Sequence, residues 1–171
     1  MPKSLADGHL KFTILTTKPA NPAAPTVTEL NAGTAIDASC SVLASDFTFS
    51  AADSDKVNEK ALCTTNNANA IGADNFTAGA TFFRYFDEAG AVDLTEDEAF
   101  QAVKEKGTTV WGYLREDGKL STAAWAAGDE FLGMELLTDR SQRAQNAGGY
   151  IKRRVPFEPQ AGWDGVVAAA A

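Results

Sequence analysis

The sequence has few of the residues that build metal centres and thiol-based active sites. It contains two cysteines, Cys40 and Cys63, which lie far apart and outside any CxxC pair, and one histidine, His9. The usual sulfur and nitrogen ligand sets for zinc cannot be assembled from so few residues, and a disulfide framework is not indicated. We therefore expect both cysteines to be small buried hydrophobes and predict no bound metal.

Motifs for nucleotide binding and covalent catalysis are also missing. The sequence has no GxxxxGK(S/T) loop and no GxGxxG motif after a strand-like segment, so no phosphate-cradling loop is predicted. A nucleophile–base pair would have to use His9, whose neighbours Leu10 and Lys11 place it in a leading strand and not in an exposed turn. We expect His9 at a surface or rim, and we predict no catalytic residue, no cofactor and no enzyme activity.

Long apolar runs and an excess of positive charge are absent as well. No apolar segment approaches the ~18 residues of a membrane-spanning helix, and Met1–Ser4 leads into a mixed segment instead of a signal peptide. We expect a protein without a membrane segment, made in a reducing cytoplasm. Fifteen basic against twenty-three acidic residues leave a net charge of −8, which opposes tight binding to DNA phosphates.

Short strand-like segments separated by turn residues dominate what is present. Leu10, Phe12 and Ile14 alternate with Lys11 and Thr13, which is typical of a half-buried strand. Strands are predicted over residues 9–16, 39–43, 47–49, 78–86, 108–115, 129–137 and 150–157. With one flanking helix, this pattern predicts a single, mainly β domain over residues 1–171, an antiparallel β-sandwich or partly closed barrel.

The segments between and after these strands differ in character. Pro19, Pro22 and Pro25 predict an extended arm or connector over residues 17–34, because proline fixes φ and removes an amide donor. Residues 64–77 are rich in Asn, Ala and Thr and predict a surface loop. Residues 158–171 are expected to form a C-terminal extension, since prolines end the preceding strand.

Two further features are predicted from turn and capping signals. A helix is expected over residues 95–106, with Thr95 as N-cap and Glu98 completing a capping box, and with Gly107 in the left-handed position that follows. Asp117–Gly118 suits a hairpin corner between two strands.

Charge is segregated along the chain. The acidic cluster consists of Asp87, Glu88, Asp93, Glu96, Asp97 and Glu98. The basic stretch consists of Arg140, Arg143, Lys152, Arg153 and Arg154. A solvated loop and helix start is the favoured interpretation of the acids, because EF-hand spacing is absent; a calcium site and a hydrolytic carboxylate pair are the alternatives. The basic residues leave three interpretations open: solvated strand edges, head-to-tail contact between copies, or contact with DNA.

Four short segments carry a resemblance to a known family. They are Leu5–Gly8, Asn21–Thr34, Ala61–Thr64 and Trp125–Asp129. In this order the sequence resembles the major tail proteins, or tail tube proteins, of long-tailed bacteriophages that infect actinobacteria. The resemblance is strongest before Cys63.

The resemblance implies a structural protein of the virion. It implies a β-sandwich that assembles into hexameric rings, which stack into a tail tube through which DNA passes without specific binding. Other tail proteins, such as the tape measure, terminator and distal tail proteins, are the implied partners. Six copies would carry a charge of roughly −48, which would repel DNA phosphates from an acidic lumen.

These expectations define candidate contact residues. Candidate inter-subunit or inter-ring contacts are Pro22, Pro25, Leu30, Arg140, Arg143, Lys152, Arg153 and Arg154. The candidate acidic partner or lumen surface is formed by Asp87, Glu88, Asp93, Glu96 and Asp97.

Alternative functions share the same predicted architecture. A tail terminator or capsid decoration protein would cap an assembly instead of extending it. A carbohydrate-binding module would use exposed aromatic residues, for which Trp111, Tyr113, Trp125 and Trp163 are candidates. A hydrolase has the least support.

Overall fold

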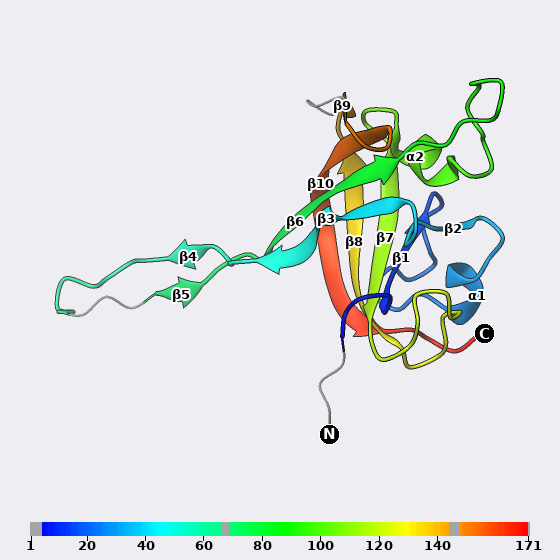
Figure 1. The fold of residues 1–171 in the computed structure, drawn as a ribbon. Coiled ribbons are helices and arrows are strands. Elements are labelled where there is room, and N and C mark those ends of the chain that lie inside the picture. Colours follow the sequence, from blue (N-terminus) through cyan, green and yellow to red (C-terminus); the bar gives the residue numbers. More distant parts are fainter. Residues whose placement is uncertain (1–4, 66–68, 144–147, 171) are drawn as a thin grey trace.

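One curled antiparallel sheet organises the computed structural model, which describes residues 5–65, 69–143 and 148–170 (Figure 1). Its strands are β1 (Leu10–Leu15), β2 (Ala35–Asp37), β3 (Val42–Ala52), β6 (Asn75–Phe83), β7 (Thr109–Glu116), β8 (Glu130–Thr138), β9 (Gln142–Arg143) and β10 (Lys152–Val166). The order across the sheet is β2-β1-β7-β8-β10-β6-β3, and β9 pairs with β10. The sheet curls into a half-barrel, which confirms the prediction of a mainly antiparallel β fold of the sandwich or barrel type.

The sheet has hydrophobic cores on both of its faces. The larger core gathers Phe12, Phe82, Met134 and Leu136 with the helix α2 (Glu98–Val103). The smaller core contains Trp111, Tyr113 and Trp125, with Leu30 from the one-turn helix α1 (Val27–Leu30). The central strands β7 and β8 are therefore covered on both sides.

Burial on both faces corrects the expectation of a half-buried first strand. Lys11 and Thr13, expected on the solvent side, are only 6% and 2% exposed. The amine of Lys11 donates to Asp37, and the indole Nε1 of Trp125 donates to Thr13 Oγ1 at 2.9 Å. These partners satisfy the polar atoms that burial would otherwise leave unpaired.

Residues 17–34 form a packed connector and not a projecting arm. Thr26 caps α1, and the carboxylate of Glu29 accepts from the Thr26 backbone at 2.8 Å to complete a capping box. Tyr113 donates its hydroxyl to the carbonyl of Pro22 at 3.0 Å. The prolines shape a loop that returns to the sheet.

The last strand is much longer than predicted. β10 continues through Pro156 and Pro159 to Val166, so most of the expected C-terminal extension is strand. Pro156 lies opposite Gly79 of β6, and its carbonyl accepts from the amide of Asp139 at 3.0 Å. Pro159 sits at a register shift between β10 and β8, a bulge position at which a missing N–H costs little.

The helix α2 is shorter than predicted and begins at a different residue. It covers Glu98–Val103, its N-cap is Asp97 and not Thr95, and the predicted capping box with Glu98 is absent. Its buried face, formed by Ala99, Phe100 and Val103, packs against the larger core, as the apolar spacing predicted.

The loop between β7 and β8 replaces the predicted tight hairpin. Residues 117–129 wrap around the guanidinium of Arg115, which is fully buried and donates to the carbonyls of Leu120 and Ala124 at 2.9 and 3.1 Å. Asp129 lies 3.3 Å from the same guanidinium. The buried arginine thus holds a long loop in place of a two-residue corner.

Candidate assembly surfaces

A long hairpin projects from the body of the molecule (Figure 1). We call residues 53–74 the arm; it continues β3 and β6 outward and contains the short pair β4 (Lys56–Val57) and β5 (Ala70–Ile71). The amide of Gly72 donates to the carbonyl of Asp55 at 2.7 Å, which closes the ladder near its base. The predicted 64–77 surface loop is corrected accordingly, because it includes β5 and the first residues of β6.

The arm carries apolar side chains that face solvent in a single copy. Val57, Leu62 and Ile71 are exposed, and Leu62 is fully so. An isolated two-stranded hairpin is only marginally stable in water. Burial of its exposed apolar side chains against another surface would stabilise it. Cys63 follows Leu62 in a turn closed by the hydrogen bond from the amide of Thr64 to the carbonyl of Ala61, and it is exposed.

Both cysteines are at the surface, which corrects the expectation that they are buried. Cys40 is also exposed, in the approach to β3. Neither thiol is paired, so the protomer contains no disulfide between them.

The acidic loop before α2 contains both surface and internal carboxylates. Asp87, Glu88 and Glu96 are exposed, and Asp93 is half-buried. Asp87 accepts from the amide of Ala91 at 2.8 Å, and Asp93 accepts from the amide of Thr95 at 3.0 Å, so both shape the loop. The loop lies at one end of the molecule, outside the sheet (Figure 1).

Asp97 is an internal residue and not part of an acidic contact surface. Its carboxylate accepts from Arg84 Nε at 2.8 Å, from the Gln101 amide at 2.6 Å and from the Tyr85 backbone at 3.1 Å. Burial alone would raise the pKa of Asp97, but these hydrogen bonds and the Arg84 charge outweigh it and hold the pKa below its ordinary value. The guanidinium also lies over the ring of Phe100, 4.1 Å from its centroid.

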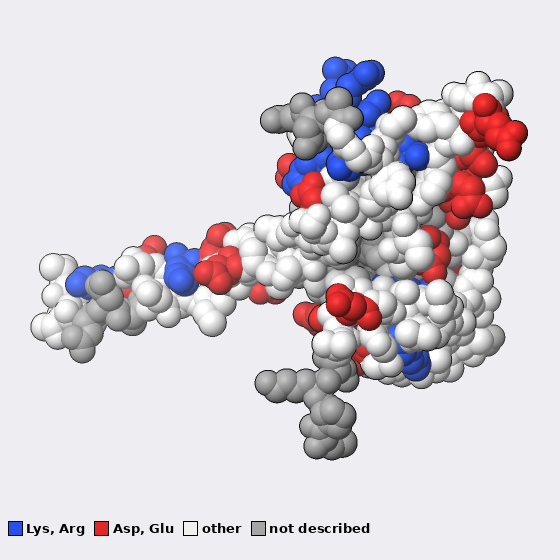
Figure 2. All heavy atoms as spheres, in the orientation of Figure 1, with Lys and Arg blue, Asp and Glu red and all other residues white. Residues whose placement is uncertain are grey.

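The basic residues gather at the same end of the molecule, over β9 and the start of β10 (Figure 2). Arg140 and Arg143 are exposed, and Lys152 and Arg153 are half-buried. Arg154 differs because it forms an ion pair with Asp46 within the protomer. Figure 2 shows acidic side chains of the β6–α2 loop on the opposite side of this end. The acidic and the basic side chains thus lie at one level of the molecule, on opposite sides of it.

The proline-rich candidates lie mostly inside the protomer. Leu30 is 3% exposed in the smaller core, Pro25 is buried and Pro22 is half-buried. The amide of Val27 donates to the carbonyl of Ala168, and the amide of Ala168 donates to the carbonyl of Pro25. This segment therefore pairs with the chain around Ala168, and Pro25 and Leu30 are packed inside the protomer.

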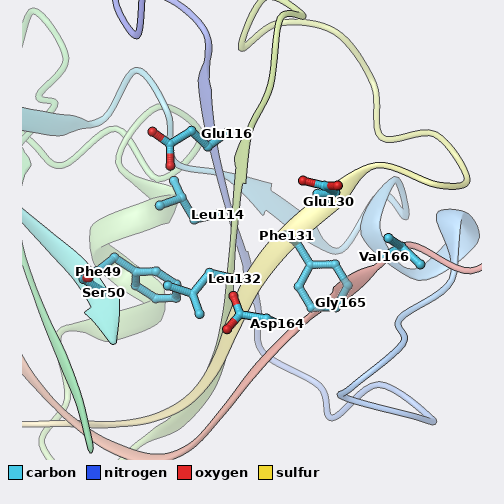
Figure 3. A pocket seen from close by; sticks show the side chains of 10 residues that line it. All are labelled: Phe49, Ser50, Leu114, Glu116, Glu130, Phe131, Leu132, Asp164, Gly165 and Val166. Carbon is cyan, nitrogen blue, oxygen red and sulfur yellow. The ribbon is translucent and has the colours of Figure 1, made fainter. Parts of the chain in front are cut away.

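A pocket of about 510 Å³ opens at one end of the curled sheet (Figure 3). Its apolar lining includes Phe49 and Leu132, and the carboxylates of Glu116, Glu130 and Asp164 surround them. None of its ten lining residues is a histidine, cysteine, lysine or arginine. Among the described residues no group of three or more potential ligands could hold a metal ion.

The aromatic residues proposed for sugar stacking are largely internal. Trp111, Tyr113 and Trp125 are all buried, and Trp163 is half-buried against the same core. A carbohydrate-binding face needs exposed rings, so the structure removes three of its four candidates. Within the described residues, no helix is long and apolar enough to cross a membrane.

The protein is thus a mainly β protein built on a half-barrel sheet. Its arm and its acidic and basic side chains are features of its surface. No curated protein matches the chain. The model of the phage tail tube protein family matches residues 1–171, and the chain belongs to this family of virion structural proteins.

Proposed function

We propose that the protein is the repeating subunit of a phage tail tube, whose copies form rings that stack around a channel for DNA. The observation that carries this proposal is the arm, which exposes apolar side chains outside the fold of a single copy. Membership of the tail tube protein family supports it. A hexameric ring, a long-tailed phage and an actinobacterial host are predictions from sequence resemblance.

Neighbours within a ring would meet through the charged surfaces at one end of the subunit. The exposed acids of the β6–α2 loop and the basic side chains over β9 lie on opposite sides of that end (Figure 2). Rotation about a ring axis would bring the acidic side of one copy to the basic side of the next. Such a contact would weaken with salt, because exposed charges are screened within about 8–10 Å at physiological ionic strength.

A charge swap tests the lateral contact. Glu88→Lys and Arg143→Glu each place like charges together and should block ring formation, whereas the double variant should restore it. Both side chains are exposed, so the single variants should fold normally. Double variants that assemble no better than the singles would refute this pairing.

Electron microscopy of purified protein tests the function as a whole. Residues 53–74 can be replaced by Asn-Gly, because Ala52 and Asn75 are paired across the two strands and a two-residue corner can join them. We expect wild-type protein to form rings or tubes and the armless variant to remain smaller while keeping its near-ultraviolet circular dichroism. Monomers of wild type at every salt and protein concentration would overturn the proposal.

Passage of DNA would be electrostatically passive. A net charge of −8 per subunit opposes phosphate binding, so DNA would slide without sticking. A channel surface with net positive charge in an assembled tube would exclude this mechanism.

A further inference from the structure

An apolar groove of about 610 Å³ lies beyond the end of β6. Phe83, Phe86, Tyr150 and Ile151 line it, together with Cys40. Tyr150 is 81% exposed and Ile151 is 56% exposed, although the ring of Tyr150 already rests edge-on against Phe83 at 5.8 Å between centroids. This groove, which we call the Tyr150 groove, is an apolar surface that no described residue of the same copy covers.

The arm and the Tyr150 groove stand at opposite ends of the same two strands. β3 starts near Cys40 at the groove and ends at Ala52, where the arm begins. β6 starts at Asn75, where the arm ends, and finishes at Phe83 in the groove. A contact between one copy's arm and the next copy's groove is therefore heterologous, and it can repeat along a row of copies.

The arm is long enough to extend from one copy to the groove of a neighbouring copy. Ten residues of extended chain span roughly 33 Å, and the nine residues of β6 span roughly 30 Å. The arm is thus about as long as the strand pair from which it grows. Its tip, residues 61–64, carries the fully exposed Leu62 beside Cys63.

The distribution of charge along the arm limits the part that can meet a basic surface. Asp53, Asp55 and Asp74 lie at its base, and toward the tip Glu59 stands between Lys56 and Lys60. Beside the groove the chain is basic instead: Lys152 pairs with Phe83, and Arg153 lies opposite Arg143 on β9.

The basic side of the groove is left uncompensated within one copy. Among the described residues no carboxylate forms an ion pair with Arg143, Lys152 or Arg153. Burial, with the charges of Arg143 and Arg84, lowers the pKa of Arg153. Like charges directly opposite each other destabilise a strand pair, so an acidic partner would relieve them.

We propose that the tip of the arm, led by Leu62, docks in the Tyr150 groove of a second copy. This inference rests on the proposed function and specifies how its subunits connect. Leu62 would be covered by Phe86, Tyr150 and Ile151, and Glu59 would approach Lys152 and Arg153 of β10, which leaves Arg143 to the lateral contact. Cys63 of one copy would then lie close to Cys40 of the next.

The two native cysteines make this contact directly measurable. Assembled wild-type protein, treated with a short bismaleimide, should give a ladder of covalent multimers on a denaturing gel. Cys40→Ser and Cys63→Ser should each abolish the ladder, and an assembly mixed from both variants should give dimers only. Links that persist in either single variant would show a homotypic contact and overturn the proposal.

Apolar substitutions provide a second measurement. Leu62→Ser, or Tyr150→Ser with Ile151→Ser, should raise the protein concentration needed for assembly by about tenfold or more. Combining the tip and groove changes should add little, because both remove one contact. Leu120→Ser, at an exposed leucine on another loop, is the matched control and should change nothing.

The outcomes separate this inference from the proposed function. Tubes that form without a Cys40–Cys63 link, and that tolerate Leu62→Ser, would leave the tail tube function standing and refute the docking site. Wild-type protein that never assembles would refute both.

Discussion

Replacing Asp97 by alanine should be among the most destabilising single changes in this protein. The carboxylate is fully buried and accepts hydrogen bonds from Arg84, Gln101 and the Tyr85 backbone. The Arg84 side chain is only 10% exposed, so the substitution would leave its charge in the interior without a partner. Removing one member of such a pair costs about 3–5 kcal/mol of unfolding free energy.

Urea unfolding followed by circular dichroism measures this effect. With a slope of about 2 kcal/mol per molar urea, a loss of about 4 kcal/mol lowers the midpoint by about 2 M. Glu96→Ala is the matched control, because Glu96 is an exposed acid on the same loop and should change the free energy by less than about 0.5 kcal/mol.

The same comparison has a defined pH dependence. Because the pKa of Asp97 is lower in the folded than in the unfolded state, its contribution to stability is complete above the unfolded pKa of about 4. The contribution disappears as pH falls through the lower folded value. The difference between wild type and Asp97→Ala should therefore be large at neutral pH and shrink in strong acid. A difference below about 1 kcal/mol at neutral pH, or one that acid leaves unchanged, would refute the reasoning.

Three further predictions concern packing, capping and ionisation. Gly133→Ala would place a Cβ 2.7 Å from Tyr113 Cε1, so it should cost about 1–3 kcal/mol in thermal unfolding, whereas Gly118→Ala, in open space, should be nearly neutral. Thr26→Ala removes the cap of α1 and should cost about 1 kcal/mol in urea, and an unchanged midpoint would mean that the cap contributes nothing. Burial, with a smaller contribution from Glu29, raises the pKa of Tyr113, so ultraviolet titration should ionise this phenol only with alkaline unfolding. Ionisation of Tyr113 in the folded protein would contradict its burial.

Strand positions were predictable where a local pattern determined them. The predicted strand at 129–137 matches β8 at Glu130–Thr138, with Leu132, Met134 and Leu136 on the side of the larger core. The end of β10 was not predictable in this way, because a strand tolerates proline only where its neighbours leave the amide position free. That condition depends on Gly79 and on the bulge at Pro159, which no local pattern specifies.

The burial of β1 also depends on distant residues. Thr13 is covered because Trp125, 112 positions along the chain, donates to it. The alternation of polar and apolar residues in β1 correctly predicts a strand. It also predicts that only one face of the strand is buried, whereas both faces are. The second face of β1 is covered by residues of the loop 117–129, which Arg115 holds in place. The sequence of that loop has no hydrophobic periodicity from which this packing could be predicted.

The acidic and basic clusters could be recognised in the sequence, but the sequence did not show which of their residues are exposed and which are buried. Glu96 and Asp97 are adjacent acids of the same cluster, yet one is exposed and the other is buried with Arg84. The arm gave a weaker signal, because its Asn, Ala and Thr composition is typical of a loop. The only indication of a hairpin was the pair of strand-like segments on either side of the arm, which belong to β3 and β6.

The place of β10 in the sheet has a consequence for the order of folding. This strand is the last in the chain, yet it lies between β8 and β6 and joins the β1–β7–β8 group to the β6–β3 pair. Before β10 is synthesised, the two groups have no shared strand and each keeps an open edge. Pairing over such long sequence separations is slow. The nascent chain therefore cannot complete its sheet early, and Tyr150 and Ile151 reach the groove only when β10 arrives.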